Sequence, residues 1–256
     1  HLVTVSFSGG LDSSVLAHNA KRWAKYVRLV LVSSETITSE EIENAKSVAK
    51  ELDLNLDVID FDWLSHNELA SNPINRCYQC KKALAKLWKD HAKELEFDII
   101  VEGTTATEMT GRRPGYQALK EEGIVSPFIT ADLSKSHLRE YARKYDLSIA
   151  ERPSMACLAT RFPYDTQITK ELLKKIEEFE KRIRELTGIK GLRARYHESV
   201  VRIEVQPEER DAFFDMEILD NLYEIGRELG FQHITFDVKG YRPGSMDETL
   251  CDEETD

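Results

Sequence analysis

The feature that most constrains this chain is the stretch 3–14, where an alternating apolar run ends abruptly at Gly9 and Gly10. The alternation of apolar and polar residues predicts a β-strand. Two adjacent glycines let backbone amides approach a ligand closely. A helix is expected directly after them, with Asp12 among the polar residues that can cap its first amides.

Free amides at the start of a helix, together with the helix dipole, favour a bound phosphate. The stretch lacks the lysine of the GxxxxGK[ST] loop. Ser8-Gly9-Gly10-Leu11-Asp12-Ser13 instead resembles the pyrophosphate loop of ATP pyrophosphatases, which split ATP between its α and β phosphates and adenylate a substrate. The resemblance implies an ATP site at Ser8, Gly9, Gly10, Asp12, Ser13 and Ser14. The alternative is a plain glycine turn, which a six-residue match directly after a strand makes the weaker interpretation.

Strands and helices alternate over the first part of the chain. Strands are predicted at 27–33, 54–61 and 97–101 in addition to the first one, and helices of a dozen or more residues lie between them. This order predicts an α/β fold with a parallel sheet, whose ligands bind at the carboxyl ends of the strands. The segment 104–115 lacks periodicity and is expected to be a long loop near that site.

A second, smaller α+β domain is predicted downstream. A charged helix is expected at 169–187, then strands at 192–197 and 200–206, a helix around 211–229 and a strand at 234–238, with the strands paired antiparallel. The expected organisation is therefore a pyrophosphate-loop domain at 1–164 with the cysteine-bearing segments, a C-terminal α+β domain at 165–246, and an acidic, disordered tail at 247–256.

Charge and hydropathy limit the classes of partner. The 35 Lys and Arg residues against 46 Asp and Glu residues give a net charge of −11, which argues against broad nucleic-acid binding. No apolar run reaches the length of a membrane span, and the sequence starts without a basic region or a cleavage site. We therefore expect a cytoplasmic protein with no membrane partner.

Four cysteines in such a chain do not suggest a disulfide framework. Cys77 and Cys80 lie at the start of a predicted helix and fit a zinc half-site, a redox pair or an iron–sulfur half-site, while a chance pair is a fourth alternative. Cys157 lies in an aperiodic segment and can supply a third thiolate, whereas Cys251 in the acidic tail is most simply a bystander. Three thiolates leave one iron of a [4Fe–4S] cluster open; with one His or carboxylate they also satisfy zinc.

Several motifs along the chain resemble, in order, those of the LarE family of ATP-dependent sulfurtransferases. They are Ser8-Gly9-Gly10-Leu11-Asp12-Ser13, Asn72-Pro73, Arg76-Cys77-Tyr78, Arg113-Pro114-Gly115, Ala156-Cys157-Leu158-Ala159-Thr160-Arg161, Arg202-Ile203-Glu204 and Gly240-Tyr241-Arg242. The resemblance implies adenylation of a carboxylate of pyridinium-3,5-biscarboxylic acid mononucleotide and its conversion to a thiocarboxylate. The product serves the biosynthesis of a nickel-pincer nucleotide cofactor.

One branch of this family sacrifices the sulfur of the cysteine that matches Cys157, and another holds a [4Fe–4S] cluster that carries an extra sulfide. Because Cys77, Cys80 and Cys157 are all present, the chain is similar to the second branch, which favours a cluster over zinc. The resemblance further implies ATP with Mg²⁺, a sulfide donor and a homo-oligomer, hexameric in relatives. Asp12 is the best-placed carboxylate for the metal, with a helix cap as its alternative role.

Arginines on two neighbouring predicted strands form a candidate phosphate clamp, namely Arg193, Arg195 and Arg202. The alternative is an exposed strand face whose charges are balanced by glutamates. The resemblance places Arg193, Arg195 and Glu204 at phosphate or metal contacts near the sulfur site. The catalytic residues are therefore expected to be Cys157, Asp12 and Arg195.

The sequence departs from the family pattern after the fourth strand, where the usual Asp-Gly-Thr-Asn is replaced by Glu102-Gly103-Thr104-Thr105. The departure leaves open a variant substrate. Two other functions also stay open: a cluster-dependent tRNA thiolase, against which the net charge and the lack of an added RNA module count, and a non-catalytic metal- or cluster-binding scaffold.

Overall fold

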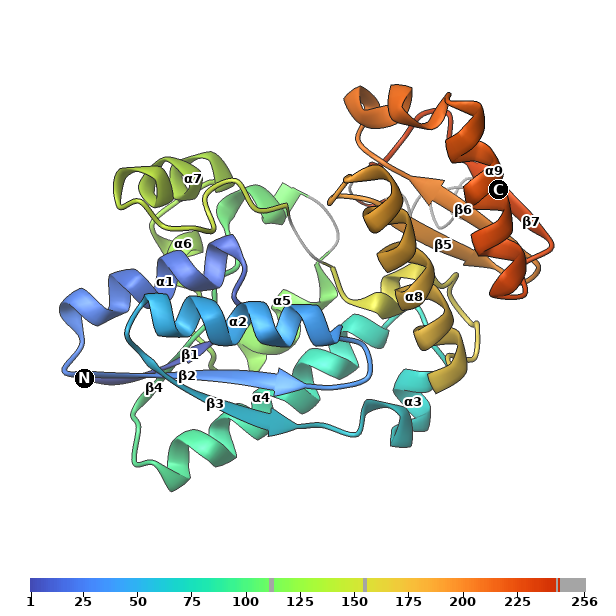
Figure 1. The fold of residues 1–256 in the computed structure, drawn as a ribbon. Coiled ribbons are helices and arrows are strands. Elements are labelled where there is room, and N and C mark those ends of the chain that lie inside the picture. The colour runs from blue at the N-terminus through green and yellow to red at the C-terminus, as the bar shows by residue number, and fades with distance from the viewer. Residues whose placement is uncertain (111–112, 154–155, 243, 245–256) are drawn as a thin grey trace. The chain divides into compact units, whose positions relative to one another are not determined.

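The computed structural model describes residues 1–110, 113–153, 156–242 and 244, and Figure 1 shows the elements that they form. Contacts divide the chain into two compact units. The first contains residues 1–69 and 74–153, and the second contains residues 70–73 and the described residues from 156 onward. The domain limits expected from the sequence, with a boundary after residue 164, stay a prediction, and the acidic tail and Cys251 lie outside the described residues.

The first unit is built on a four-stranded parallel sheet in the order β3-β2-β1-β4. The strands are β1 (Leu2–Ser6), β2 (Tyr26–Ser33), β3 (Asn55–Asp60) and β4 (Ile99–Val101). In register, Val5 on β1 lies between Leu29 on β2 and Val101 on β4. The α/β architecture predicted from alternating strands and helices is confirmed.

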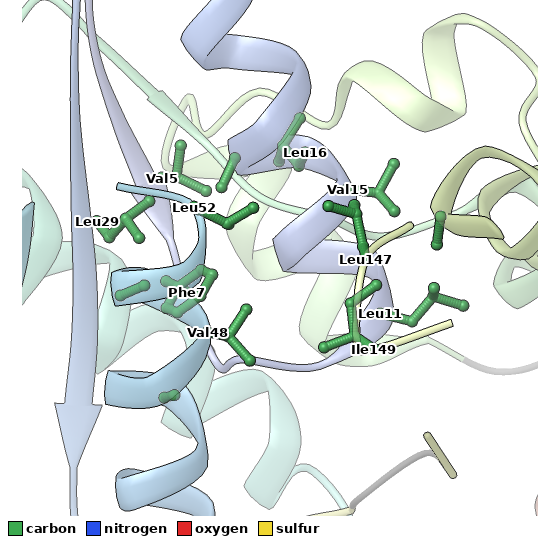
Figure 2. Close-up of a cluster of buried hydrophobic side chains, with 14 of the residues drawn as sticks. Val5, Phe7, Leu11, Val15, Leu16, Leu29, Val48, Leu52, Leu147 and Ile149 are labelled. Atoms are coloured by element: carbon green, nitrogen blue, oxygen red, sulfur yellow. The ribbon is translucent and has the colours of Figure 1, made fainter. Parts of the chain in front are cut away.

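Helices cover both faces of this sheet. On one face lie α1 (Leu11–Trp23), α2 (Ser39–Glu51) and α7 (Lys135–Lys144), and on the other lie α4 (Arg76–Glu94) and α5 (Pro114–Glu121). A hydrophobic core lies on each face of the sheet, and the side chains of β2 alternate between the two. Leu29 and Leu31 belong to the first core, drawn in Figure 2, while Val30 and Val32 belong to the second. This explains why the β2 sequence reads as a continuous aliphatic run rather than an alternation.

Short elements complete the first unit: the 3-10 turns η1 (Trp63–Ser65) and η2 (Ala106–Thr110), and the helices α3 (Asn67–Ala70) and α6 (Pro127–Thr130). The expectation of a long irregular loop at 104–115 is wrong for its described residues, since η2 and the start of α5 lie there. Pro114 takes the first position of α5, where its missing N–H costs nothing. Its neighbours lack a helical hydrophobic period because the helix is only two turns long.

Helices begin where the sequence supplies caps. Thr38 accepts a hydrogen bond from the Glu41 amide while Glu41 bonds back to Thr38, and Ser134 makes the same reciprocal pair with His137. Thr169 caps α8 (Lys170–Thr187), which ends at Gly188 in the left-handed conformation.

The second unit has a three-stranded sheet in the order β5-β6-β7. Strands β5 (Arg193–His197) and β6 (Val200–Glu204) form the expected antiparallel hairpin, but β7 (His233–Phe236) pairs parallel to β6, so the prediction of antiparallel pairing is wrong there. The reason is that α9 (Met216–Glu228) crosses over between the two strands. This helix was predicted from Asp211; it begins later because Asp215 caps it, and the 3-10 turn η4 (Pro207–Phe213) precedes it.

The core of the second unit forms between its helices and its sheet. Ile176, Phe179 and Ile183 on α8 are fully buried, and the Phe179 ring meets the Phe231 ring edge-on at 5.6 Å between centroids. A side chain at Gly226 on α9 would overlap Ile234 of β7. The helix therefore packs on the strand at a distance that only glycine permits. Within the part of the chain that the structure describes, no helix is both long enough and apolar enough to cross a membrane.

Candidate functional site

The glycine loop connects the carboxyl end of β1 to α1. Gly10 is the N-terminal capping position, and no side chain caps the helix there. Gly9 has a φ of 69°, and an added Cβ would lie 2.6 Å from the Cα of Ala45 on α2. Glycine is therefore required at this position both for its conformation and for space. An uncapped helix start beside a close-packed glycine turn is the arrangement that binds phosphate.

The serines of the loop divide into two roles. The Ser13 hydroxyl accepts a hydrogen bond from the Ser8 amide at 3.2 Å and donates one to the Gly10 carbonyl at 3.3 Å, so it holds the loop in shape. The Ser14 side chain is fully buried, and its hydroxyl has no hydrogen-bond partner among the described residues. Ser8 is exposed and is the serine best placed to meet a ligand.

Asp12 does not cap α1, so its alternative role as a capping residue is wrong. Its Oδ2 lies 3.5 Å from the Lys135 ammonium, while its Oδ1 is buried with no hydrogen-bond partner within the described ranges. Burial raises the pKa of Asp12 to about 6, with the Lys135 charge opposing the rise and the Glu108 charge adding to it. A buried carboxylate oxygen without a donor suits a divalent cation, because Mg²⁺ takes carboxylate ligands.

Lys135 and Glu108 complete this cluster, and the sequence did not indicate either as a site residue. Lys135 is the first residue of α7, and its Nζ lies 3.4 Å from Glu108 Oε1 in addition to its contact with Asp12. Glu108 also accepts a hydrogen bond from the Thr105 amide at 3.1 Å. The Ser134 cap marks in the sequence where α7 begins, but only the packing of α7 against α1 brings Lys135 to Asp12.

The altered segment after β4 lies against the glycine loop. A Cβ at Gly103 would lie 3.0 Å from the Asp12 carbonyl carbon. Glu102 is buried; one of its carboxylate oxygens accepts from the Thr104 amide at 2.9 Å and hydroxyl at 2.6 Å, and the other accepts from the Ser126 hydroxyl. Glu102, which replaces the usual aspartate, therefore stabilises the segment after β4 through buried hydrogen bonds.

Two of the three candidate ligand cysteines lie at the start of α4 in the first unit. Cys77 and Cys80 are half-buried and form no disulfide among the described residues, and the Arg76 guanidinium donates to Cys77 Sγ at 3.3 Å. Cysteine sulfur is a ligand that both an iron–sulfur cluster and zinc take. The donor chemistry therefore fits such a group. The described residues contain no group of three His, Cys, Asp or Glu side chains gathered to hold a metal ion.

Cys157 belongs to the second unit, where it is an exposed free thiol directly before η3 (Leu158–Arg161). Its backbone is held by Arg161, whose Nη1 donates to the Cys157 carbonyl at 3.2 Å and to the Ala156 carbonyl at 2.6 Å. The other side of the same guanidinium makes a bidentate pair with Glu180, at 2.8 and 3.1 Å. Both side chains of this ion pair are almost fully buried.

Two of the three arginines of the predicted clamp are buried: Arg193 and Arg195 are 3% and 9% exposed, so the alternative of an exposed strand face is wrong for them. Burial, followed by the charge of Arg161, lowers the pKa of Arg193 to about 10. Arg195 donates to Glu204 at 2.8 Å and to the Thr160 carbonyl at 2.7 Å, beside the Cys157 segment.

Arg202 is the most exposed of the three arginines and donates to the other oxygen of Glu204 at 3.0 Å. Glu204 itself is fully buried. Each of its two carboxylate oxygens accepts a hydrogen bond from one arginine. Within the second unit, the structure thus brings Arg195, Arg202 and Glu204 together.

Comparison with known proteins decides the family. The model of the queuosine biosynthesis protein QueC matches residues 2–85, which contain the glycine loop and both cysteines of α4. The pyridinium-3,5-bisthiocarboxylic acid mononucleotide synthase of Lactiplantibacillus plantarum is 32% identical over 97% of this chain and 90% of its own length. This chain belongs to the family of that synthase, the LarE family.

Two uncharacterised proteins are also similar to this chain over nearly its whole length. An uncharacterised protein of Synechocystis is 29% identical over 96% of this chain and 92% of its own length, and one of Methanocaldococcus jannaschii is 28% identical over 94% and 90%. Because the match to the Lactiplantibacillus plantarum synthase spans both units, the resemblance to LarE proteins that the motifs indicated is confirmed along nearly the whole chain.

Proposed function

We propose that this protein is an ATP-dependent sulfurtransferase of cofactor biosynthesis. It adenylates a carboxylate of pyridinium-3,5-biscarboxylic acid mononucleotide, releases pyrophosphate, and converts the acyl-adenylate to a thiocarboxylate with release of AMP. The single observation that carries the proposal is the glycine loop of a LarE-family chain, beside which one buried oxygen of Asp12 has no hydrogen-bond partner among the described residues.

The first unit activates the carboxylate. A carboxylate is a poor electrophile, and adenylation turns one of its oxygens into a leaving group. The amides of the glycine loop and the Ser8 hydroxyl donate hydrogen bonds to the phosphates. Asp12 would hold Mg²⁺, and the bound ion would neutralise charge on the departing pyrophosphate. Lys135, 3.5 Å from Asp12, adds a second positive charge at the same place.

The second unit binds the substrate and contains Cys157. Arg193, Arg195 and Arg202 are assigned to the substrate phosphate, with Arg202 the most accessible of the three. Arg195 is also assigned a catalytic role, because its bond to the Thr160 carbonyl couples it to the segment that begins with Cys157. A pre-formed guanidinium cluster recognises a phosphate without reorganising at the moment of reaction.

Cys77, Cys80 and Cys157 would hold a [4Fe–4S] cluster. When bound, the cluster supplies the transferred sulfur atom from a sulfide that an external donor replenishes, so that no cysteine is consumed. The role of this chain is to place the Arg76 guanidinium beside the Cys77 sulfur and to fix the Cys157 backbone through Arg161. We further assign the protein to the cytoplasm and to a homo-oligomer, hexameric by resemblance to its relatives.

The test is the iron and acid-labile sulfide content of the anaerobically purified protein, combined with AMP formation. We expect iron and sulfide together, and AMP only when the pyridinium mononucleotide is added. Cys77→Ala, Cys80→Ala and Cys157→Ala should each lose the cluster, whereas Cys251→Ala is the matched control that keeps it. Zinc without iron would refute the cluster, absence of substrate-dependent AMP would support a scaffold, and AMP formation with tRNA would support a tRNA thiolase.

A further inference from the structure

Large apolar side chains are exposed along one side of α9 and just before it. Phe214, Met216, Leu219 and Tyr223 are 72%, 70%, 42% and 52% exposed. The three within the helix follow one another at intervals of three and four residues, so they share a face. The opposite face packs inward through Leu222, Ile225 and Gly226. We call the four exposed residues the α9 stripe; a cluster of this size on a small unit marks an interaction surface.

The charges around the α9 stripe restrict its partner. Asp215, Glu217, Asp220 and Glu224 are all exposed, and the last three follow a helical line beside the stripe. Two α9 stripes placed face to face would oppose these carboxylates, which is unfavourable. The complementary surface must therefore be both apolar and basic.

The first unit carries such a surface at the end of α1. Trp23 and Tyr26 are 80% and 60% exposed, and Lys21, Arg22 and Lys25 are interleaved with them. Beside them lies a hollow of about 300 Å³, lined by Lys21, Lys25 and Tyr26 among others. We call the surface formed by Lys21, Arg22, Trp23, Lys25 and Tyr26, together with the hollow beside them, the basic hollow.

The charge of the basic hollow is not cancelled locally. Asp53 lies 3.1 Å from Lys21 and neutralises it. The contacts that the structure gives Arg22 are to the neutral side chains of Tyr145 and Tyr141, and Lys25 stacks over the Tyr26 ring. The surface lies at the amino end of β2, whereas the glycine loop follows the carboxyl end of β1, and these two strands are parallel. It is therefore separate from the ATP site within the first unit.

We propose that the α9 stripe of one copy of this chain docks into the basic hollow of a second copy. Aromatic and aliphatic side chains of the stripe pack against Trp23 and Tyr26, while its flanking carboxylates face Arg22 and Lys25. The two surfaces differ, so the contact is head-to-tail and produces a closed ring, or an open chain if the rotation does not close. This assignment is independent of the reaction that the protein catalyses.

Charge reversal in the full-length chain tests the pairing, with the mass measured by light scattering at increasing protein concentration. We expect the wild type to assemble into a multiple of 29.4 kDa. Asp220→Lys with Glu224→Lys, or Arg22→Glu with Lys25→Glu, should each weaken association by about tenfold or more, and the four changes together should restore it to within about threefold. Restoration cannot come from a misfolded variant.

A matched control and a local probe accompany the measurement. Lys174→Glu with Lys181→Glu changes exposed residues of α8 and should leave the mass unchanged. Trp23 is exposed while Trp63 and Trp88 are buried, so its fluorescence should shift to shorter wavelength on assembly, and Trp23→Phe should remove the shift. A wild-type monomer, an assembly indifferent to either reversal, or a failure of the four changes to restore association would overturn the proposal.

Discussion

We expect the ionised carboxylate of Asp12 to lower the free energy of unfolding of the protein, although the ATP site needs this carboxylate. Its pKa rises from the usual 3.8 to about 6, chiefly through burial. One pKa unit corresponds to about 1.4 kcal/mol, so the ionised carboxylate costs the empty protein about 3 kcal/mol at pH 7. Asp12→Asn removes that charge at constant shape. We therefore expect the variant to be more stable by about 1–3 kcal/mol, or a melting temperature higher by roughly 3–10 °C.

The pH dependence of this gain follows from the sign of the shift. A raised folded-state pKa means that the protonated form is favoured on folding; the stability is fully present below about pH 4 and is lost as the pH rises through about 6. The advantage of Asp12→Asn should therefore be largest at pH 7 and above and should vanish near pH 4. The measurement is the free energy of unfolding in urea across this range, without nucleotide or metal.

Two comparisons make the stability result decisive. Asp53→Asn changes an aspartate that is 94% exposed and should alter the free energy of unfolding by less than about 0.5 kcal/mol at any pH. Asp12→Asn should also lose Mg²⁺-dependent ATP binding, because the amide is a weaker metal ligand. A variant that is no more stable than the wild type at pH 7, or whose gain is the same at pH 4, would refute the assignment of a desolvation cost to Asp12.

Two other substitutions test the remaining charged clusters. Lys135→Met should weaken ATP binding by about tenfold or more and leave adenosine binding unchanged, because only the phosphates contact the ammonium group. Lys144→Met, at the far end of α7, is the control, and calorimetric titration measures the binding of ATP and of adenosine to each variant. An equal loss of affinity for the two ligands would contradict this role of Lys135. Glu180→Gln should lower the free energy of unfolding by about 3–5 kcal/mol, since it leaves the Arg161 charge buried without its partner. The exposed neighbour Glu178→Gln should change it little, and a loss no greater than that of this control would show that the pair is not held as the structure has it.

Local patterns predicted most of the elements. The alternation that ends at Gly9 and Gly10 predicted β1, the loop and α1, because a strand period and a glycine turn are properties of neighbouring residues. The helix expected at 169–187 begins where Thr169 caps it, for the same reason. The parallel pairing of β7 was missed, because strand direction depends on where α9 returns the chain.

The candidate site also combines features that local sequence determines with features that only the fold determines. The sequence by itself determined its chemistry: a phosphate-binding glycine loop, three thiols and a set of arginines, all of which are residue types at short spacings. Only the tertiary structure decided which charges are buried and which meet. Lys135 reaches Asp12 because α7 packs on α1, and Arg161 reaches Glu180 because η3 packs on α8. Burial and long-range pairing set the pKa of Asp12, and neither can be read from the neighbours of a residue in the chain.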